Sequence, residues 1–119
     1  MRKIIDTRRK RLKRKASIRK KIHGTPERPR MTVYKSNSHT YVQVIDDDAG
    51  KTVAAASNLE KDQRGVKNTV AELARLGELI GQRLKAKQIT SVVFDRNGYR
   101  YHGKVKAIAE GARKAGISF

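Results

Sequence analysis

The sequence contains no cysteine, only two prolines and no long hydrophobic run. Without cysteine the chain has no disulfide framework, no thiolate nucleophile and no cysteine-ligated zinc, so nothing argues for secretion or redox chemistry. The longest apolar run, residues 53–56, is far too short for a membrane-spanning helix. Ile4 and Ile5 precede a basic block rather than the hydrophobic region of a signal peptide. We therefore expect a soluble intracellular protein of one domain.

Acidic residues are also scarce, since 11 Asp and Glu stand against 29 Lys and Arg, for a net charge of +18. Residues 1–30 hold fourteen basic and two acidic side chains, so most of the excess lies in the first quarter of the chain. This segment has too few apolar residues to offset the entropy of ordering it. We expect a basic arm, residues 1–27, that is flexible alone and becomes helical and ordered when a polyanion neutralises its charges. The acid-free run 8–15 indicates nucleic-acid binding.

A linker at residues 24–29 holds both prolines and a glycine, and it separates the arm from a domain at residues 28–119. Within that domain, β-branched and aromatic residues predict a hairpin of strands 30–35 and 40–45, then a strand at 51–57. Apolar residues recur every three or four positions from Val66 to Leu84 and predict a helix, in which Gly77 and Gly81 let a backbone approach the sheet. A buried strand at 91–94 and a helix at 103–115 follow. The pattern predicts an α+β fold whose mixed sheet combines an antiparallel meander with a β-helix-β crossover, and helices pack against it.

The predicted hairpin concentrates aromatic, amide, hydroxyl and cationic groups between Tyr34 and Tyr41. These groups stack on unpaired bases and bond 2′-hydroxyls and phosphates in RNA. The alternative is structural, because tyrosine favours strands and covers cores, and Asn37 suits a turn. The pattern alone leaves both interpretations open.

A second polar cluster covers residues 95–104, where a strand ends and a helix begins, a place that attracts phosphate. Asp95 and His102 are the residue types of acid–base catalysis, but no serine or cysteine nucleophile and no second carboxylate lies nearby in the sequence. We therefore expect no enzyme activity, with Asp95 orienting Arg96 or capping a turn. The histidines stand singly, without metal-ligand spacing, so we expect no metal and no cofactor.

The order of motifs closely resembles one family over essentially the whole chain. The residues that carry the resemblance are residues 92–99, 101–107, 112–116 and Phe119 at the C-terminal end, together with residues 28–30, 36–39, 41–47 and 54–57. They are similar to the family of ribosomal protein eighteen of the bacterial large subunit. The resemblance implies a ribonuclease H-like mixed sheet without nuclease activity, in a 5S rRNA-binding protein of the central protuberance. It also implies a place in the cytoplasmic 50S subunit, with 5S rRNA, 23S rRNA and other 5S-binding ribosomal proteins as partners, and no membrane or small-molecule substrate.

The expected RNA contacts come from the arm, the linker, the hairpin and the 95–104 cluster. They are Arg8, Arg9, Lys10, Arg11, Lys13, Arg14, Lys15, Arg19, Lys20, Lys21, Arg28, Arg30, Tyr34, Lys35, Ser36, Asn37, His39, Tyr41, Arg96, Asn97, Tyr99, Arg100, Tyr101, His102 and Lys104. Two other classes stay open. A DNA-compacting architectural protein is compatible with the same charge, and a metal-dependent nuclease would need a carboxylate cluster that the predicted strands do not offer.

Overall fold

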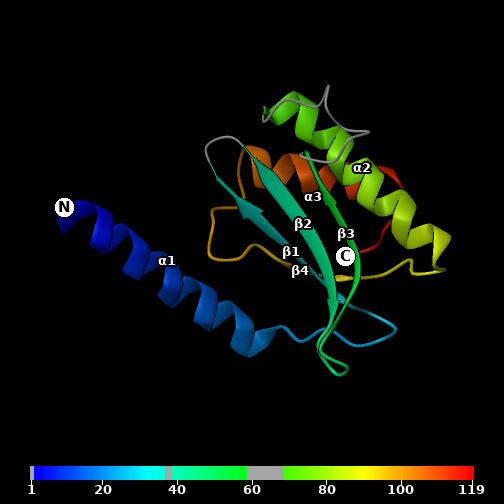
Figure 1. The fold of residues 1–119 in the computed structure, drawn as a ribbon, viewed down its shortest axis with the longest axis horizontal. Coiled ribbons are helices and arrows are strands. Elements are labelled where there is room, and N and C mark those ends of the chain that lie inside the picture. Colours follow the sequence, from blue (N-terminus) through cyan, green and yellow to red (C-terminus); the bar gives the residue numbers. More distant parts are fainter. Residues whose placement is uncertain (1, 37–38, 59–68) are drawn as a thin grey trace.

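The computed structural model describes residues 2–36, 39–58 and 69–119, with the backbone alone for residues 2–7. The elements follow the order α1 (Arg2–Lys21), β1 (Arg30–Lys35), β2 (Thr40–Asp46), β3 (Lys51–Ser57), α2 (Val70–Ala86), β4 (Val93–Asp95) and α3 (Lys104–Lys114). Figure 1 shows α1 reaching away from the body of the protein, on the side of the strands remote from α2. The predicted strands 30–35 and 51–57 have the observed bounds, and α3 lies within the predicted helix.

The four strands form one mixed sheet in the order β3-β2-β1-β4. β1 pairs antiparallel with β2, so that Tyr34 lies opposite Tyr41, and β2 pairs antiparallel with β3. β4 pairs parallel with β1, which means that the chain crosses through α2 from one edge of the sheet to the other. The α+β class, the meander and the crossover are therefore confirmed, and the likeness to ribonuclease H stays a prediction.

Two details of the crossover differ from the expectation. Residues 66–68, where the pattern starts its helix, lie outside the described residues, and the described helix begins at Val70 after the N-cap Thr69, whose hydroxyl accepts from the Glu72 amide. The strand predicted as buried on both faces is the sheet edge β4, in which Val93 and Phe94 are only partly buried. A short apolar run therefore does not by itself identify a strand that is buried on both faces.

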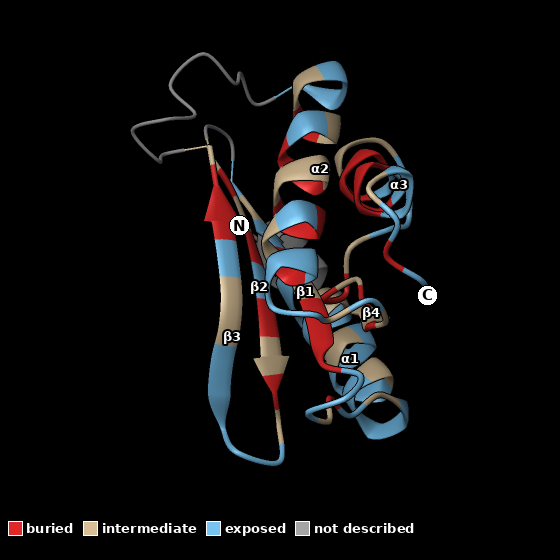
Figure 2. Cartoon of the chain, turned by 90° about the vertical axis from the view of Figure 1, so that its right-hand side faces the viewer, coloured by how far each residue is buried: buried red, intermediate tan, exposed pale blue. Residues whose placement is uncertain are grey.

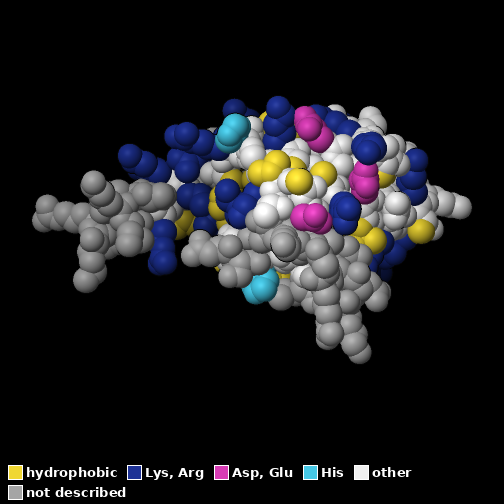
Figure 3. Space-filling model, turned by 90° about the horizontal axis from the view of Figure 1, so that it is seen from above, with side chains coloured by type: hydrophobic (Ala, Val, Ile, Leu, Met, Phe, Trp, Pro, Cys, Tyr) yellow, Lys and Arg dark blue, Asp and Glu magenta, His cyan; other side chains and the backbone are white. Residues whose placement is uncertain are grey.

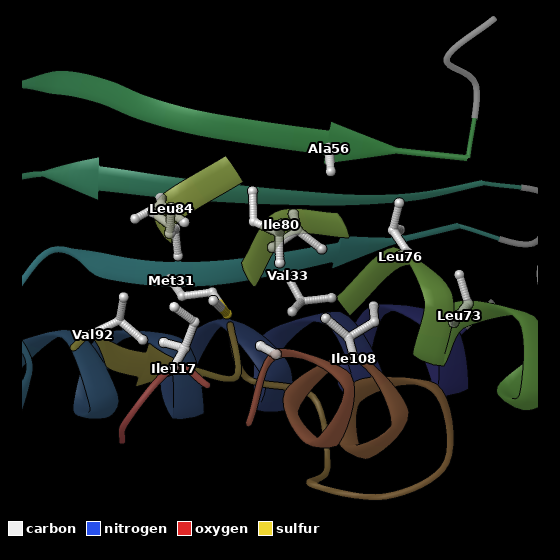
Figure 4. Close-up of a cluster of buried hydrophobic side chains, with 13 residues drawn as sticks. Met31, Val33, Ala56, Leu73, Leu76, Ile80, Leu84, Val92, Ile108 and Ile117 are labelled. Atoms are coloured by element: carbon white, nitrogen blue, oxygen red, sulfur yellow. The ribbon is translucent and has the colours of Figure 1, made fainter. Parts of the chain in front are cut away.

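The hydrophobic core lies between one face of the sheet and the pair of helices α2 and α3 (Figure 2). Period-two alternation sends Met31, Val33, Val42 and Val44 to this face, and each is fully buried. Figure 4 shows side chains of β1 meeting those of α2 and α3, including Ile80 and Ile108. The strands are thereby fixed from one side, which leaves their opposite face available.

Glycines bring α2 and α3 into backbone contact. A Cβ added to Gly77 would lie 2.2 Å from the carbonyl oxygen of Ile108, and one added to Gly111 would lie 2.2 Å from that of Ala74. The close approach predicted for Gly77 therefore exists, but the partner is α3 and the expectation that it would be the sheet was wrong. The sequence shows that a small residue allows another segment to approach closely, but only the tertiary structure shows which segment it is.

Candidate nucleic-acid interface

A groove runs between α1 and the sheet face that lies opposite the core. Alternate residues of β1 and β2 point into it, and α1 adds Lys15 and Arg19, one helical turn apart. Its volume is about 440 Å³, and its lining comprises Lys15, Arg19, Arg30, Thr32, Tyr34, Tyr41, Gln43, Ile45 and Asn97. The groove thus places cations on one wall and aromatic and amide groups on the other.

The two tyrosines of the hairpin form an aromatic pair in this groove. Their ring centroids lie 6.1 Å apart at an interplanar angle of 45°, and Tyr34 is 51% exposed. Both residues belong to the strand face away from the core, so they do not cover it. Of the two interpretations that the sequence leaves open, the structure favours a surface role, because the half-exposed Tyr34 ring is available to stack on a base and Tyr41 is only partly buried beside it.

α1 is held against the loop that follows β4. The Nε of Arg14 donates to the carbonyl oxygen of Gly98 at 3.0 Å, and the Nε of Arg11 donates to that of Asn97 at 3.4 Å. The Arg11 guanidinium also lies 4.5 Å from the centroid of the Tyr99 ring, as in a cation–π contact. Two arm residues predicted to contact RNA therefore also attach the arm to the domain.

Several residues of the predicted 95–104 cluster have positioning contacts within the protein. Asn97 is buried, and its Nδ2 donates to the carbonyl oxygen of Val33 at 3.0 Å. The Tyr99 hydroxyl donates to the carbonyl oxygen of Lys35 at 3.2 Å, and the Arg96 guanidinium donates to that of Tyr99 at 2.8 Å. These hydrogen bonds fix the loop after β4 to the end of β1, and α1 binds to the same loop.

The end of that cluster lies elsewhere. Arg100 and His102 are exposed and Lys104 is partly buried at the start of α3. Tyr101 packs edge-on against Phe94 and accepts a hydrogen bond from Arg113 of α3. None of these residues lines the groove, so the structure does not bring the whole cluster to one place.

Arg30 is buried, with an exposed fraction of 4%, between two carboxylates. Its Nη1 donates to Asp95 at 2.8 Å, and its Nε donates to Asp47 at 2.9 Å. Burial lowers the pKa of Arg30, but the hydrogen bonds and charges of the two carboxylates outweigh it and raise the pKa above the ordinary value. The hydrogen bond from Arg30, together with that from the Gly24 amide, holds the pKa of Asp47 at about 2.

The contacts of Asp95 bear out one of its two expected roles, the turn cap, and the ion triad gives Arg30 a structural role. Asp95 does not orient Arg96; it pairs with Arg30, and it caps a turn by accepting from the Asn97 amide at 2.9 Å. Arg30 lines the groove, but its guanidinium donates to the carboxylates of Asp47 and Asp95. Because the Gly24 amide also donates to Asp47, these contacts hold the strand ends and the linker together. A single sequence does not show such a pairing, because the partners lie 17 and 65 positions away.

Most of the predicted cations of the arm also form an exposed surface along α1. Figure 3 shows Lys and Arg side chains gathered there, while the acidic side chains of that view lie over the rest of the molecule. The exposed members on α1 are Arg8, Arg9, Lys10, Lys13, Arg14, Arg19, Lys20 and Lys21. Arg28 of the linker is also exposed. Ser36 and His39 close the hairpin through mutual hydrogen bonds, and Asn37 lies outside the described residues.

Sequence reasoning missed Thr32, Gln43 and Ile45, which line the groove beside the tyrosines. The signal was present, because strand residues an even number of positions apart share a face. Thr32 lies two positions before Tyr34, and Gln43 and Ile45 lie two and four positions after Tyr41. Among the described residues, no His, Asp or Glu cluster of three or more is placed to hold a metal ion. No helix in the described part of the chain combines the length and apolar character needed to cross a membrane.

Comparison with known proteins gives one consistent result. The profile of a family described as ribosomal L18 of archaea, bacteria, mitochondria and chloroplasts matches residues 5–119. A large ribosomal subunit protein uL18 from Treponema denticola is 61% identical over 114 residues, which covers 96% of this chain and 95% of the relative. The uL18 of Treponema pallidum is 56% identical over 119 residues, covering 100% and 99%, and that of Myxococcus xanthus is 55% identical over 111 residues, covering 92% and 94%.

Proposed function

The chain belongs to the ribosomal L18 family, and from that membership and the geometry of the groove we propose that it binds 5S rRNA and helps to attach it to 23S rRNA in the central protuberance. As a member of the family it is a structural constituent of the large ribosomal subunit in the cytoplasm, and it is not an enzyme. The other 5S-binding ribosomal proteins are its proposed neighbours.

The observation that carries the proposal is the groove itself, in which one wall is cationic and the other is aromatic and polar. The exposed cations of α1 neutralise phosphates, and this contact supplies affinity without sequence information. Tyr34 and Tyr41 provide stacking surfaces, which RNA uses in its loops and bulges. A ligand that fits both walls is a folded RNA with unpaired bases, because a continuous DNA duplex presents no unstacked base to the tyrosines.

The salt dependence of binding tests the role of α1. We compare the wild type with a variant in which Arg8, Arg9, Lys10 and Lys13 are replaced by alanine, because alanine preserves helix propensity. The matched control replaces four exposed cations of α2 and α3 (Arg75, Lys85, Lys106 and Lys114) and so has the same net charge. The slope of log K against log salt is negative, and each phosphate that is no longer neutralised makes it shallower by about 0.7 to 0.9. The slope of the α1 variant is therefore expected to be shallower than that of the wild type by roughly 3 units.

The same titration separates RNA binding from DNA compaction. The wild type is expected to bind 5S rRNA more tightly than duplex DNA of equal length at moderate salt, and the control variant is expected to keep most of the wild-type slope. Equal affinity for both nucleic acids would favour the DNA-compacting alternative. Equal slopes for the two variants would refute the proposal that the cations of α1 contact the RNA backbone.

A further inference from the structure

We propose that the groove between α1 and the sheet receives a single unstacked nucleobase, with Tyr34 and Tyr41 as its stacking surface and Gln43 as the residue that recognises its edge. This inference rests on the proposed function, because it names the part of a bound RNA that enters the groove. It also assigns a role to Gln43, a residue that the sequence pattern did not select.

The first argument is the state of the aromatic pair. Tyr34 and Tyr41 are cross-strand neighbours on the surface face, and their rings are tilted by 45° at 6.1 Å rather than stacked flat on each other. A tilted pair leaves ring faces uncovered, and Tyr34 is half exposed. Stacking of a base on such a ring contributes about 1–3 kcal/mol and tolerates any base. The pair therefore explains capture of a base without explaining selection among bases.

The second argument is the position and the free hydrogen-bonding groups of Gln43. It is exposed and lines the groove. It lies opposite Thr32, and it is two residues along β2 from Tyr41. Two residues along a strand span about 7 Å, so the amide lies beside a base stacked on the Tyr41 ring. Within the described ranges, the Gln43 side chain has no hydrogen-bond partner. A free amide offers a donor and an acceptor together, and this combination recognises a base edge.

The third argument is the opposite wall. Lys15 and Arg19 are four positions apart on α1 and both line the groove, so they face the tyrosines and Gln43 across it. Cations at this place meet the phosphates on either side of an extruded nucleotide. A volume of about 440 Å³ is in the range of small-ligand pockets, so it suits one nucleotide and excludes a paired helix.

The test combines affinity with base-specific chemical probing of 5S rRNA by dimethyl sulfate and a carbodiimide. Gln43→Ala is compared with Gln82→Ala, which changes an exposed glutamine of α2 away from the groove. In the wild-type complex one base is expected to be protected at its pairing edge. Gln43→Ala is expected to expose that base and weaken binding roughly 5- to 160-fold, the range of one bidentate base contact, while Gln82→Ala changes neither.

A second arm removes the base instead of the amide. An abasic substitution at the protected nucleotide is expected to weaken wild-type binding more than Gln43→Ala does, because it removes the stacking on the tyrosines as well as the edge contact. Once the base is absent, Gln43→Ala is expected to cause almost no further loss of affinity, because the edge that the amide recognises is gone. Tyr34→Leu is expected to weaken binding to intact 5S rRNA and to leave the abasic RNA nearly unaffected. Circular dichroism confirms that each variant is folded.

The outcomes distinguish this inference from the function on which it rests. If the wild type binds 5S rRNA selectively but Gln43→Ala gives the same affinity and the same protections as Gln82→Ala, the base pocket is refuted and the function stands. If the wild type does not prefer 5S rRNA to duplex DNA, the proposed function itself fails.

Discussion

Replacing Asp47 by asparagine measures how much the buried ion triad contributes to the stability of the domain. Asp47 accepts hydrogen bonds from Arg30 at 2.9 and 3.1 Å and from the Gly24 amide at 2.7 Å, and its side chain is only 14% exposed. These contacts lower its pKa from 3.8 to about 2. Each pKa unit corresponds to about 1.36 kcal/mol, so the charged form contributes about 2 kcal/mol to the free energy of unfolding at neutral pH.

The pH dependence follows from the direction of that shift. Because the folded-state pKa of Asp47 is below the unfolded-state value, its contribution is present above about pH 4 and is lost as pH falls toward 2. An asparagine at this position cannot carry the charge. The stability difference between the wild type and Asp47→Asn is therefore expected to be about 2 kcal/mol at pH 7 and about half of that at pH 3.

Urea unfolding followed by circular dichroism between pH 7 and pH 3 measures this difference. The control is Asp48→Asn, which changes the neighbouring carboxylate, 53% exposed and paired with His23 at 2.6 Å. An exposed pair contributes little, so this control is expected to change stability by less than about 0.5 kcal/mol. Equal losses in the two variants, or a difference for Asp47→Asn that does not shrink on acidification, would refute the reasoning.

Three further substitutions test other contacts. Gly98 has a φ of +77°, and an added Cβ would lie 2.6 Å from the carbonyl oxygen of Arg11, so Gly98→Ala is expected to displace α1 and weaken RNA binding, as measured by filter binding, with the α2–α3 core intact. Gly77→Ala is expected to cost about 1–3 kcal/mol in urea unfolding, although the same change in an exposed helix is stabilising, because the Cβ meets the Ile108 backbone. Leu76→Ala removes a fully buried side chain, and a loss of about 2–5 kcal/mol by the same measurement is expected. Unchanged RNA affinity in the first variant, or unchanged stability in either of the others, would contradict these contacts.

Local patterns in the sequence determined the location of the charge and the bounds of several helices and strands. Strands 30–35 and 51–57 follow from β-branched residues bounded by turn formers, and α3 follows from an apolar face that ends before Gly116, which has a φ of +101°. The basic character of α1 is visible from composition alone. Family membership followed from motif order, because the signature near residues 92–107 depends on residue identity and not on spatial contacts.

Tertiary structure alone decided which face of the sheet is covered and which groups meet. Alternation shows that Tyr34 shares a face with Thr32, but only the packing of α2 and α3 on the other face makes that face a surface. The pairing of Arg30 with Asp95 and the attachment of α1 through Gly98 join residues that are far apart along the chain. The physical reason is that periodicity is a local property of the backbone, whereas ion pairs, grooves and backbone contacts depend on the arrangement of all the elements at once.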